Sequence, residues 1–245
     1  MEIRAGGPGQ EPVAVAVTMR TPGNDFELAA GFLHTEGLVR EREDIASVNY
    51  CELPANEQHY NVVTVRLRHP FDAGRLQRNF YATSSCGICG KASLDQVTVE
   101  CRPLPPGPVV ARSVVLALPE ALREGQRVFE QTGGLHASGL FDVTGKLLAV
   151  REDVGRHNSV DKLVGWAMLG GSLPLRDRIL LVSGRVSFEI VQKAAVAGVP
   201  VVCAVSAPSS LAVEAAGHLG MTVIGFLRGS GFNVYTHPDR VELGS

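Results

Sequence analysis

The fold is decided by residues 178–228, RILLVSGRVSFEIVQKAAVAGVPVVCAVSAPSSLAVEAAGHLGMTVIGFLR. Three apolar runs in this stretch have the length and composition of strands that are buried on both faces. The segments between them are long enough for helices, and Phe188, Val191 and Ala195 share one face of the first. This alternation predicts parallel strands joined by right-handed crossovers. The runs occupy 178–182, 199–205 and 222–227.

The residues before this stretch continue the α/β pattern. The segment 119–132 is a helix candidate, and two apolar segments flank Thr144-Gly145, which predicts a β-hairpin. A helical stripe follows and ends at Gly170-Gly171, because glycine commonly terminates a helix. We therefore expect an α/β domain over 109–245 with a mostly parallel central sheet. The stripe consists of Val160, Leu163, Val164 and Ala167.

The first hundred residues read as a smaller α+β portion. Residues 13–19 and 61–67 have strand patterns. Asn24 and Glu27 have the spacing of a capping box at the start of a helix, and Gly37 supplies a stop signal. One face of this helix is formed by Phe26, Ala29, Ala30 and Leu33.

A single composition break divides the chain. PLPPGP at 103–108 indicates a linker between an N-terminal portion, 1–108, and the domain over 109–245. Long apolar periodicity is poor around 80–101, so we expect a mobile loop over about 82–102.

The composition is that of an ordinary globular protein. Of the 245 residues, 45% are hydrophobic and 20% are charged. The sequence has no apolar run of about 18 residues and no signal-peptide pattern at its start, so we expect a cytoplasmic protein without a membrane span. The net charge of -2 and the pI of about 6.4 do not indicate nucleic-acid binding. Five cysteines, an odd number, argue against a disulfide framework.

The sharpest local feature is SSCGICG at 84–90. Glycines beside Cys86 and Cys89 let the backbone expose a thiolate, and turn amides together with Lys91 favour the charged form. The pair alone is compatible with a redox couple, half of a zinc site, a sulfur carrier or two small packing residues. Zinc is disfavoured because the chain has no second C-x-x-C and no H-x₃₋₅-H.

Polar turns follow the three predicted strands. If the strands are parallel, all three turns lie at one edge of the sheet, where open α/β sheets bind ligands. Helix N-termini there favour anions, and Arg185 and Arg228 add charged donors, so we expect a phosphate-bearing ligand. Any one turn alone is also compatible with ordinary helix capping, for example by Ser183 or Ser209. The turns are Ser183-Gly184-Arg185, Ser206-Ala207-Pro208-Ser209 and Arg228-Gly229-Ser230-Gly231.

A third polar group comprises TGGLH at 132–136 and REDVGRHNSVDK at 151–162. His136 and His157 are candidate acid or base groups. Asp161 and Lys162 either line a pocket or are solvated charges in the first turn of a helix. His136 is equally compatible with a satisfied core histidine.

In combination, these motifs resemble the FdhD family, the formate dehydrogenase accessory sulfurtransferases. The resemblance spans almost the whole chain in order and is far more specific than the C-x-x-C pair. The matching stretches are VTMRTPGNDFELAAGFLHTEGL (17–38), SSCGICG (84–90), TGGLH (132–136), EDVGRHNSVDK (152–162), SGRVSFE (183–189), SAPSSLAVEAA (206–216) and GFLRGSGFNVYTHP (225–238).

The resemblance implies a cytidine-deaminase-like α/β domain without the deaminase zinc site, and a homodimer. It implies that a cysteine desulfurase donates sulfur, which the protein carries as a persulfide to a molybdenum bis(molybdopterin guanine dinucleotide) cofactor for the formate dehydrogenase catalytic subunit. That cofactor would be a substrate, with GDP as a mimic, and no permanent cofactor or metal is expected.

The resemblance also implies site residues. The persulfide carrier falls on Cys86, and a lesser role falls on Cys89. The family's cofactor-binding stretch falls on Phe226, Leu227, Arg228, Gly229, Ser230 and Gly231, and we add the sheet-edge residues Ser183, Arg185, Ser206 and His136.

Two other functions remain open from the residues. A cofactor-binding insertion chaperone would use the sheet edge and dispense with Cys86. A dithiol oxidoreductase would need Cys86 and Cys89 equally.

Overall fold

The computed structural model describes residues 1–51, 59–72, 74 and 103–242. Its largest element is a six-stranded sheet with the strand order β11-β10-β9-β8-β6-β7. The strands β8, β9 and β10 pair in parallel, which confirms the prediction, while the β6–β7 hairpin and the edge strand β11 are antiparallel. The bounds are β6 His136–Asp142, β7 Leu147–Asp153, β8 Arg178–Val182, β9 Val201–Ala204, β10 Thr222–Arg228 and β11 Gly231–Val234.

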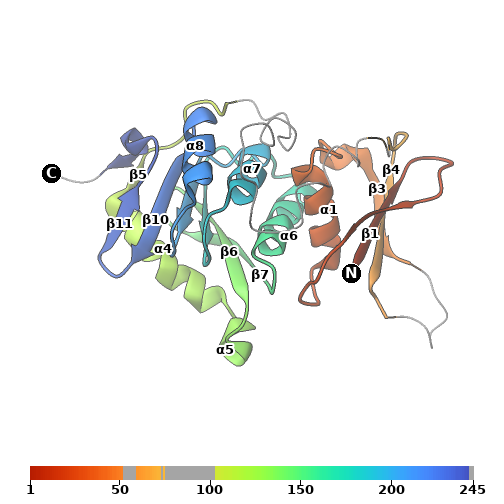
Figure 1. Cartoon of the computed structure of the whole chain (residues 1–245), viewed down its shortest axis with the longest axis horizontal. Coiled ribbons are helices and arrows are strands. Elements are labelled where there is room, and N and C mark those ends of the chain that lie inside the picture. Colours follow the sequence, from red (N-terminus) through yellow and green to blue (C-terminus); the bar gives the residue numbers. More distant parts are fainter. Residues whose placement is uncertain (52–58, 73, 75–102, 243–245) are drawn as a thin grey trace.

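Helices cover both faces of this sheet (Figure 1). Successive residues of β8 point to opposite faces: Leu180 and Val182 pack under α6, α7 and α8, whereas Ile179 and Leu181 pack under α4. The alternation explains why the strand reads as one continuous apolar run. The helices are α4 Arg112–Gly125, α5 Phe129–Thr132, α6 Arg156–Leu169, α7 Phe188–Val196 and α8 Ser210–His218.

A second sheet, with the order β2-β1-β4-β3, forms the other end of the molecule (Figure 1). Helix α1, Asp25–Thr35, buries Ala29, Ala30 and Leu33 against it, as predicted. Phe26 was expected on the same buried face but is 37% exposed. The strands are β1 Glu2–Gly6, β2 Val13–Val17, β3 Ile45–Tyr50 and β4 Val62–Leu67.

Helices α1 and α6 lie side by side between the two sheets (Figure 1). A Cβ atom added at Gly31 would lie 1.8 Å from the carbonyl oxygen of Asp161, and one added at Gly165 would lie 1.8 Å from that of Glu27. Only glycine permits this approach, so the two backbones are in direct contact. The division into 1–108 and 109–245 stays a prediction, but these helices pack tightly across it.

The predicted start of the helix over 119–132 is wrong. Helix α4 begins at Arg112, and Pro119 lies inside it, where the sequence pattern placed the start of a helix over 119–132. The buried stripe of Val115, Leu118 and Leu122 continues through the proline, so packing outweighs the missing N–H.

Helix α1 begins directly after Asn24, as predicted, but the predicted capping box is absent. Asn24 has a left-handed backbone with φ 58° and makes no side-chain cap. The Glu27 side chain is used elsewhere, because it forms a two-pronged ion pair with Arg151 of β7.

Short elements complete the described chain. Residues 103–108 form neither helix nor strand, and β5, Val110–Ala111, pairs in parallel with β12, Val241–Glu242. The 3₁₀ turns are η1 Arg42–Asp44 and η4 Pro238–Arg240. Within the described ranges, every helix is too short or too polar to cross a bilayer.

Candidate functional site

The turns after β8, β9 and β10 meet at one edge of the six-stranded sheet, as the sequence predicts. The N–H of Val186 donates to the carbonyl of Ala207 at 3.2 Å, and the N–H of Ser209 donates to the carbonyl of Val186 at 2.9 Å. The N–H of Phe226 donates to the carbonyl of Ser206 at 3.1 Å. These backbone bonds join the turn after β8 to the turn after β9, and the turn after β9 to Phe226 near the end of β10. The surface formed by these two turns and the end of β10 is called the carboxyl edge below.

Phe226 has an unusual backbone at this edge. Its φ is 53°, a left-handed value that is costly for a bulky aromatic residue, and the β10–β11 register shifts beside it. Its ring is partly exposed, and the Arg228 guanidinium lies 5.8 Å from the ring centroid. Such strain persists where the surrounding structure fixes it, commonly at ligand sites. The predicted stretch 226–231 therefore comprises the end of β10, the turn at Gly229-Ser230 and the start of β11, with a strained backbone at Phe226.

Leu227 and Arg112 determine which parts of this stretch can contact a ligand and how the stretch is held. Leu227 is fully buried in the core, so of the predicted stretch it can offer a ligand only backbone. Arg112 of α4, which sequence reasoning missed, donates to the carbonyl of Ser230 at 3.0 Å. The contact ties the turn to the helix on the other face of the sheet, across 118 positions of sequence.

The residues after β8 have distinct roles. The Ser183 hydroxyl accepts the N–H of Ala137 at 2.9 Å, so it fixes β6 to the edge and does not cap a helix. Arg185 is exposed. His136 begins β6 and lies against this turn, since a Cβ at Gly184 would come within 3.3 Å of its Nδ1. By contrast, Ser209 is an ordinary helix cap that accepts the N–H of Ala212.

Helices α6 and α7 begin at the carboxyl edge and bring Arg156, His157, Ser187 and Glu189 together; we call these four residues the edge cluster. His157 Nε2 lies 3.1 Å from Ser187 Oγ and 3.9 Å from Glu189 Oε2. The Ser187 hydroxyl donates to the Glu189 carboxylate, so its oxygen accepts the N–H of His157.

The electrostatics of the edge cluster keep histidine neutral and glutamate charged. Desolvation lowers the pKa of His157 to about 4, and the charges of Arg156 and Lys193 act in the same direction, against Glu189. Partial burial works against the charge on Glu189, but hydrogen bonds from Ser187 and from its own N–H lower its pKa. Desolvation and Arg156 also lower the pKa of His136.

The lowered pKa of His157 has a measurable consequence. We expect its ring to titrate near pH 4 in the folded protein, whereas an unfolded histidine titrates near 6.5. The unfolded chain binds this proton first, so stability should rise with pH between about 4 and 6.5. A two-dimensional NMR titration that follows the His157 ring checks this. A His157 midpoint near 6.5, the ordinary value of histidine, would contradict it.

A buried ion group lies one helical turn below the edge cluster. Lys193 Nζ contacts Thr35 Oγ1 at 3.0 Å, Glu36 Oε1 at 2.9 Å and Asp161 Oδ1 at 3.0 Å. Burial opposes the charge on Lys193, but the two carboxylates outweigh it and raise its pKa. The group fixes α6, α7 and the end of α1, and so holds His157 and Glu189 in place.

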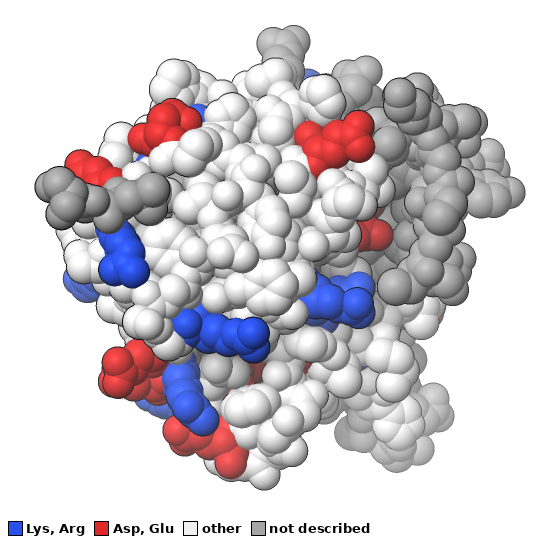
Figure 2. All heavy atoms as spheres, turned by 60° about the vertical axis from the view of Figure 1, so that its left-hand side comes forward, with Lys and Arg blue, Asp and Glu red and all other residues white. Residues whose placement is uncertain are grey.

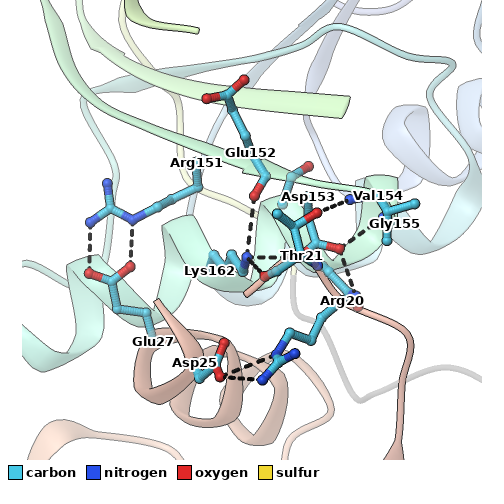
Figure 3. Close-up of polar contacts among 12 residues, drawn as sticks. Arg20, Thr21, Asp25, Glu27, Arg151, Glu152, Asp153, Val154, Gly155 and Lys162 are labelled. Atoms are coloured by element: carbon cyan, nitrogen blue, oxygen red, sulfur yellow. Dashed lines mark hydrogen bonds and ion pairs between the residues drawn. The ribbon is translucent and has the colours of Figure 1, made fainter. Parts of the chain in front are cut away.

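Lys162 forms a second buried ion pair (Figure 3). Its Nζ lies 2.7 Å from Asp153 Oδ2 and donates to the carbonyls of Thr21 and Glu152, and its side chain is 1% exposed. The other Asp153 oxygen accepts the N–H of Gly155 at 2.8 Å. Asp161 and Lys162 are therefore neither pocket lining nor solvated charges, since both pair inside the protein.

Figure 2 shows the side on which β10 and β11 lie, and basic and acidic side chains are interspersed over the lower half of this face. Among the described residues, no group of three or more histidine, cysteine or acidic side chains is arranged to hold a metal ion.

Sequence comparison decides the family. A model of the FdhD/NarQ family matches residues 11–242. The chain belongs to the FdhD/NarQ family. A relative from Mycolicibacterium paratuberculosis is 53% identical over 98% of this chain and 89% of its own length. Another from Streptomyces coelicolor is 53% identical over 99% of this chain and 87% of its own length, and both are named sulfur carrier protein FdhD.

A solved structure has the same fold as this FdhD/NarQ chain. It is the crystal structure of a candidate formate dehydrogenase accessory protein from Desulfotalea psychrophila, with a TM-score of 0.74. The match covers 98% of this chain and 89% of that one at 23% identity, which supports the mixed α/β fold alone. The cytidine-deaminase-like detail stays a prediction.

The cysteines of this FdhD/NarQ protein divide into two groups. Cys86 and Cys89, the predicted sulfur site, lie outside the described residues, as does Cys101. Cys203 is fully buried, and desolvation raises the pKa of its thiol, so it is unsuited to nucleophilic chemistry. Cys51 is half-buried.

Proposed function

We propose that the protein accepts sulfur from a cysteine desulfurase as a persulfide on Cys86 and passes it to a molybdenum bis(molybdopterin guanine dinucleotide) cofactor for formate dehydrogenase. The observation that carries this proposal is the identity of 53%, over nearly the whole chain, with relatives named sulfur carrier protein FdhD. The choice of formate dehydrogenase as the client enzyme rests on membership of the FdhD/NarQ family.

Loading is a thiol–disulfide type exchange. The Cys86 thiolate attacks the outer sulfur of the desulfurase persulfide, a new S–S bond forms on Cys86, and the desulfurase cysteine leaves as a thiolate. SSCGICG suits this step because its glycines and nearby Lys91 favour an accessible thiolate.

Delivery breaks the S–S bond that forms during loading. The S–S bond on Cys86 breaks with its electron pair on the Cys86 sulfur, and the outer sulfur takes two electrons from the molybdenum of the substrate and becomes a Mo–S ligand. The protein contributes positioning and exclusion of water, while the metal of the substrate supplies the redox change.

The carboxyl edge is the proposed cradle for this substrate. Its joined turns present backbone groups and the exposed guanidinium groups of Arg185 and Arg228, which suit pyrophosphate. Phe226, Ser206 and His136 border the same edge. GDP is the simplest probe of this cradle. The implied homodimer and cytoplasmic location belong to the same proposal.

The competing functions separate in cells. We expect Cys86→Ser to abolish formate dehydrogenase activity in a strain that lacks its own copy of the protein, because no persulfide can form. Cys89→Ser should retain much of the activity, and buried Cys203→Ser serves as a control for loss of a thiol.

Other activities of the Cys86→Ser and Cys89→Ser strains would each favour one of the two alternative functions. Full activity with Cys86→Ser would favour an insertion chaperone without sulfur chemistry. Equal loss with Cys86→Ser and Cys89→Ser would favour a dithiol oxidoreductase.

A further inference from the structure

Glu189 is an exception in a site built mostly from donors. The carboxyl edge offers Arg185, Arg228 and backbone N–H groups, all suited to anions, yet a charged carboxylate stands at the start of α7 with 37% of its side chain exposed. A carboxylate repels phosphate, so a pure anion site does not account for it. It suits a ligand that is anionic at one end and carries N–H donors at the other.

The Glu189 carboxylate has acceptor capacity to spare. Two ionised oxygens offer about four lone-pair directions. Ser187 and the N–H of Glu189 itself occupy part of this capacity. Neutral His157, 3.9 Å away, adds no opposing charge at neutral pH. The remaining lone pairs can accept hydrogen bonds from a ligand.

A donor with no hydrogen-bond partner belongs to Arg156, whose charge acts on both Glu189 and His157. The Nε atom of Arg156 is buried and has no hydrogen-bond partner among the described residues. Buried polar atoms almost always have a partner, so an unpaired guanidinium N–H suggests that a ligand supplies the acceptor. The charge of Arg156 lowers the pKa of Glu189, yet no ion pair within 4.0 Å joins the two in the described part of the chain.

A carboxylate that accepts and a guanidinium group that donates complement one kind of edge. The 2-amino-4-oxopyrimidine ring shared by guanine and pterin presents two adjacent N–H donors and a carbonyl acceptor, called the 2-amino-4-oxo edge below. β8 and β10 are two strand spacings apart, about 10 Å, so a ligand that reached both turns would be larger than a single phosphate.

We propose that Glu189 is the specificity residue that accepts the N–H donors of a 2-amino-4-oxo edge, with Arg156 donating to its carbonyl. The inference rests on the proposed function, because it names the part of the proposed cofactor substrate that the edge cluster binds. His157 and Ser187 act as positioning residues that hold the carboxylate.

The test compares ligands that differ at this edge. Affinities of the full chain are measured by calorimetry for GDP, for IDP, which lacks the 2-amino group, and for pyrophosphate. We expect GDP to bind about 10- to 100-fold tighter than IDP, the worth of one charge-assisted hydrogen bond. Glu189→Gln should remove that preference without weakening pyrophosphate binding, because the variant loses a charge that repels phosphate. Glu214→Gln, the same change at an exposed position of α8, should keep it.

A second experiment tells whether the edge cluster binds the guanine or the pterin of the substrate. Competition of neopterin against GDP, lost in Glu189→Gln, would assign the cluster to pterin, and its absence would assign it to guanine. Equal affinity for GDP and IDP together with no neopterin binding overturns the inference, as does a Glu189→Gln chain that keeps the preference. Either result leaves the sulfur-carrier proposal standing, because that depends on Cys86. A chain that binds neither GDP nor pyrophosphate overturns both the inference and the proposed cradle.

Discussion

Replacing Lys162 by methionine will lower the free energy of unfolding by about 3–5 kcal/mol, the usual cost of removing one partner of a buried ion pair. Lys162 and Asp153 are 1% and 0% exposed, so the remaining carboxylate would be buried with no cation beside it. The carbonyls of Thr21 and Glu152 would also lose their donor. Methionine nearly preserves the volume, so the effect reports charge and hydrogen bonding.

Urea unfolding followed by circular dichroism measures this loss. Lys146→Met is the matched control, because Lys146 is exposed, and it should change stability by less than about 0.5 kcal/mol. A Lys162→Met chain as stable as the control would show that the pair in Figure 3 does not hold the start of α6 to the segment around Thr21.

Replacing Gly31 by alanine should cost about 3 kcal/mol or more, at the upper end for overpacked cores. The new methyl group would lie 1.8 Å from the Asp161 carbonyl oxygen and 2.7 Å from the Gly165 backbone nitrogen. Both obstacles are backbone atoms, so no side-chain rotation relieves the overlap, and α1 must move away from α6.

The control is the same substitution in an unobstructed helix. Gly217 in α8 has only Thr236 Cγ2, at 3.9 Å, near its missing Cβ, and Gly217→Ala should be neutral or stabilise by up to about 1 kcal/mol. Thermal unfolding of the two variants compares them directly. Equal melting temperatures would contradict the direct contact of α1 and α6.

The parallel core was predictable because its signal is local. Strands covered on both faces read as continuous apolar runs, so 178–182, 199–205 and 222–227 could be placed without tertiary information. The common edge of their turns then followed from topology.

Features set by distant contacts were not predictable. Lys162 pairs with Thr21 across 141 positions, and Lys193 pairs with Thr35 across 158, so a local pattern could show only polar residues on a helix. Pro119 was misread for a similar reason, since burial under the sheet overrides a breaker.

The candidate site was predicted only in part. The ends of β8, β9 and β10 lie at one edge of the sheet as expected, but the left-handed backbone of Phe226 and the support from Arg112 have no sequence signature. Ser187 and Glu189 follow a strand at helix-start spacing, which could have indicated the edge cluster. The sulfur site rests on SSCGICG and the family alone.

The most direct test of the account is the release of sulfur from the loaded protein by cyanide. The protein is incubated with a cysteine desulfurase and cysteine, separated from small molecules and treated with cyanide, and the thiocyanate formed is measured. The wild-type chain should release thiocyanate, Cys203→Ala should match it, and Cys86→Ala should release none. A Cys86→Ala chain that still carries cyanide-labile sulfur would show that the persulfide forms elsewhere.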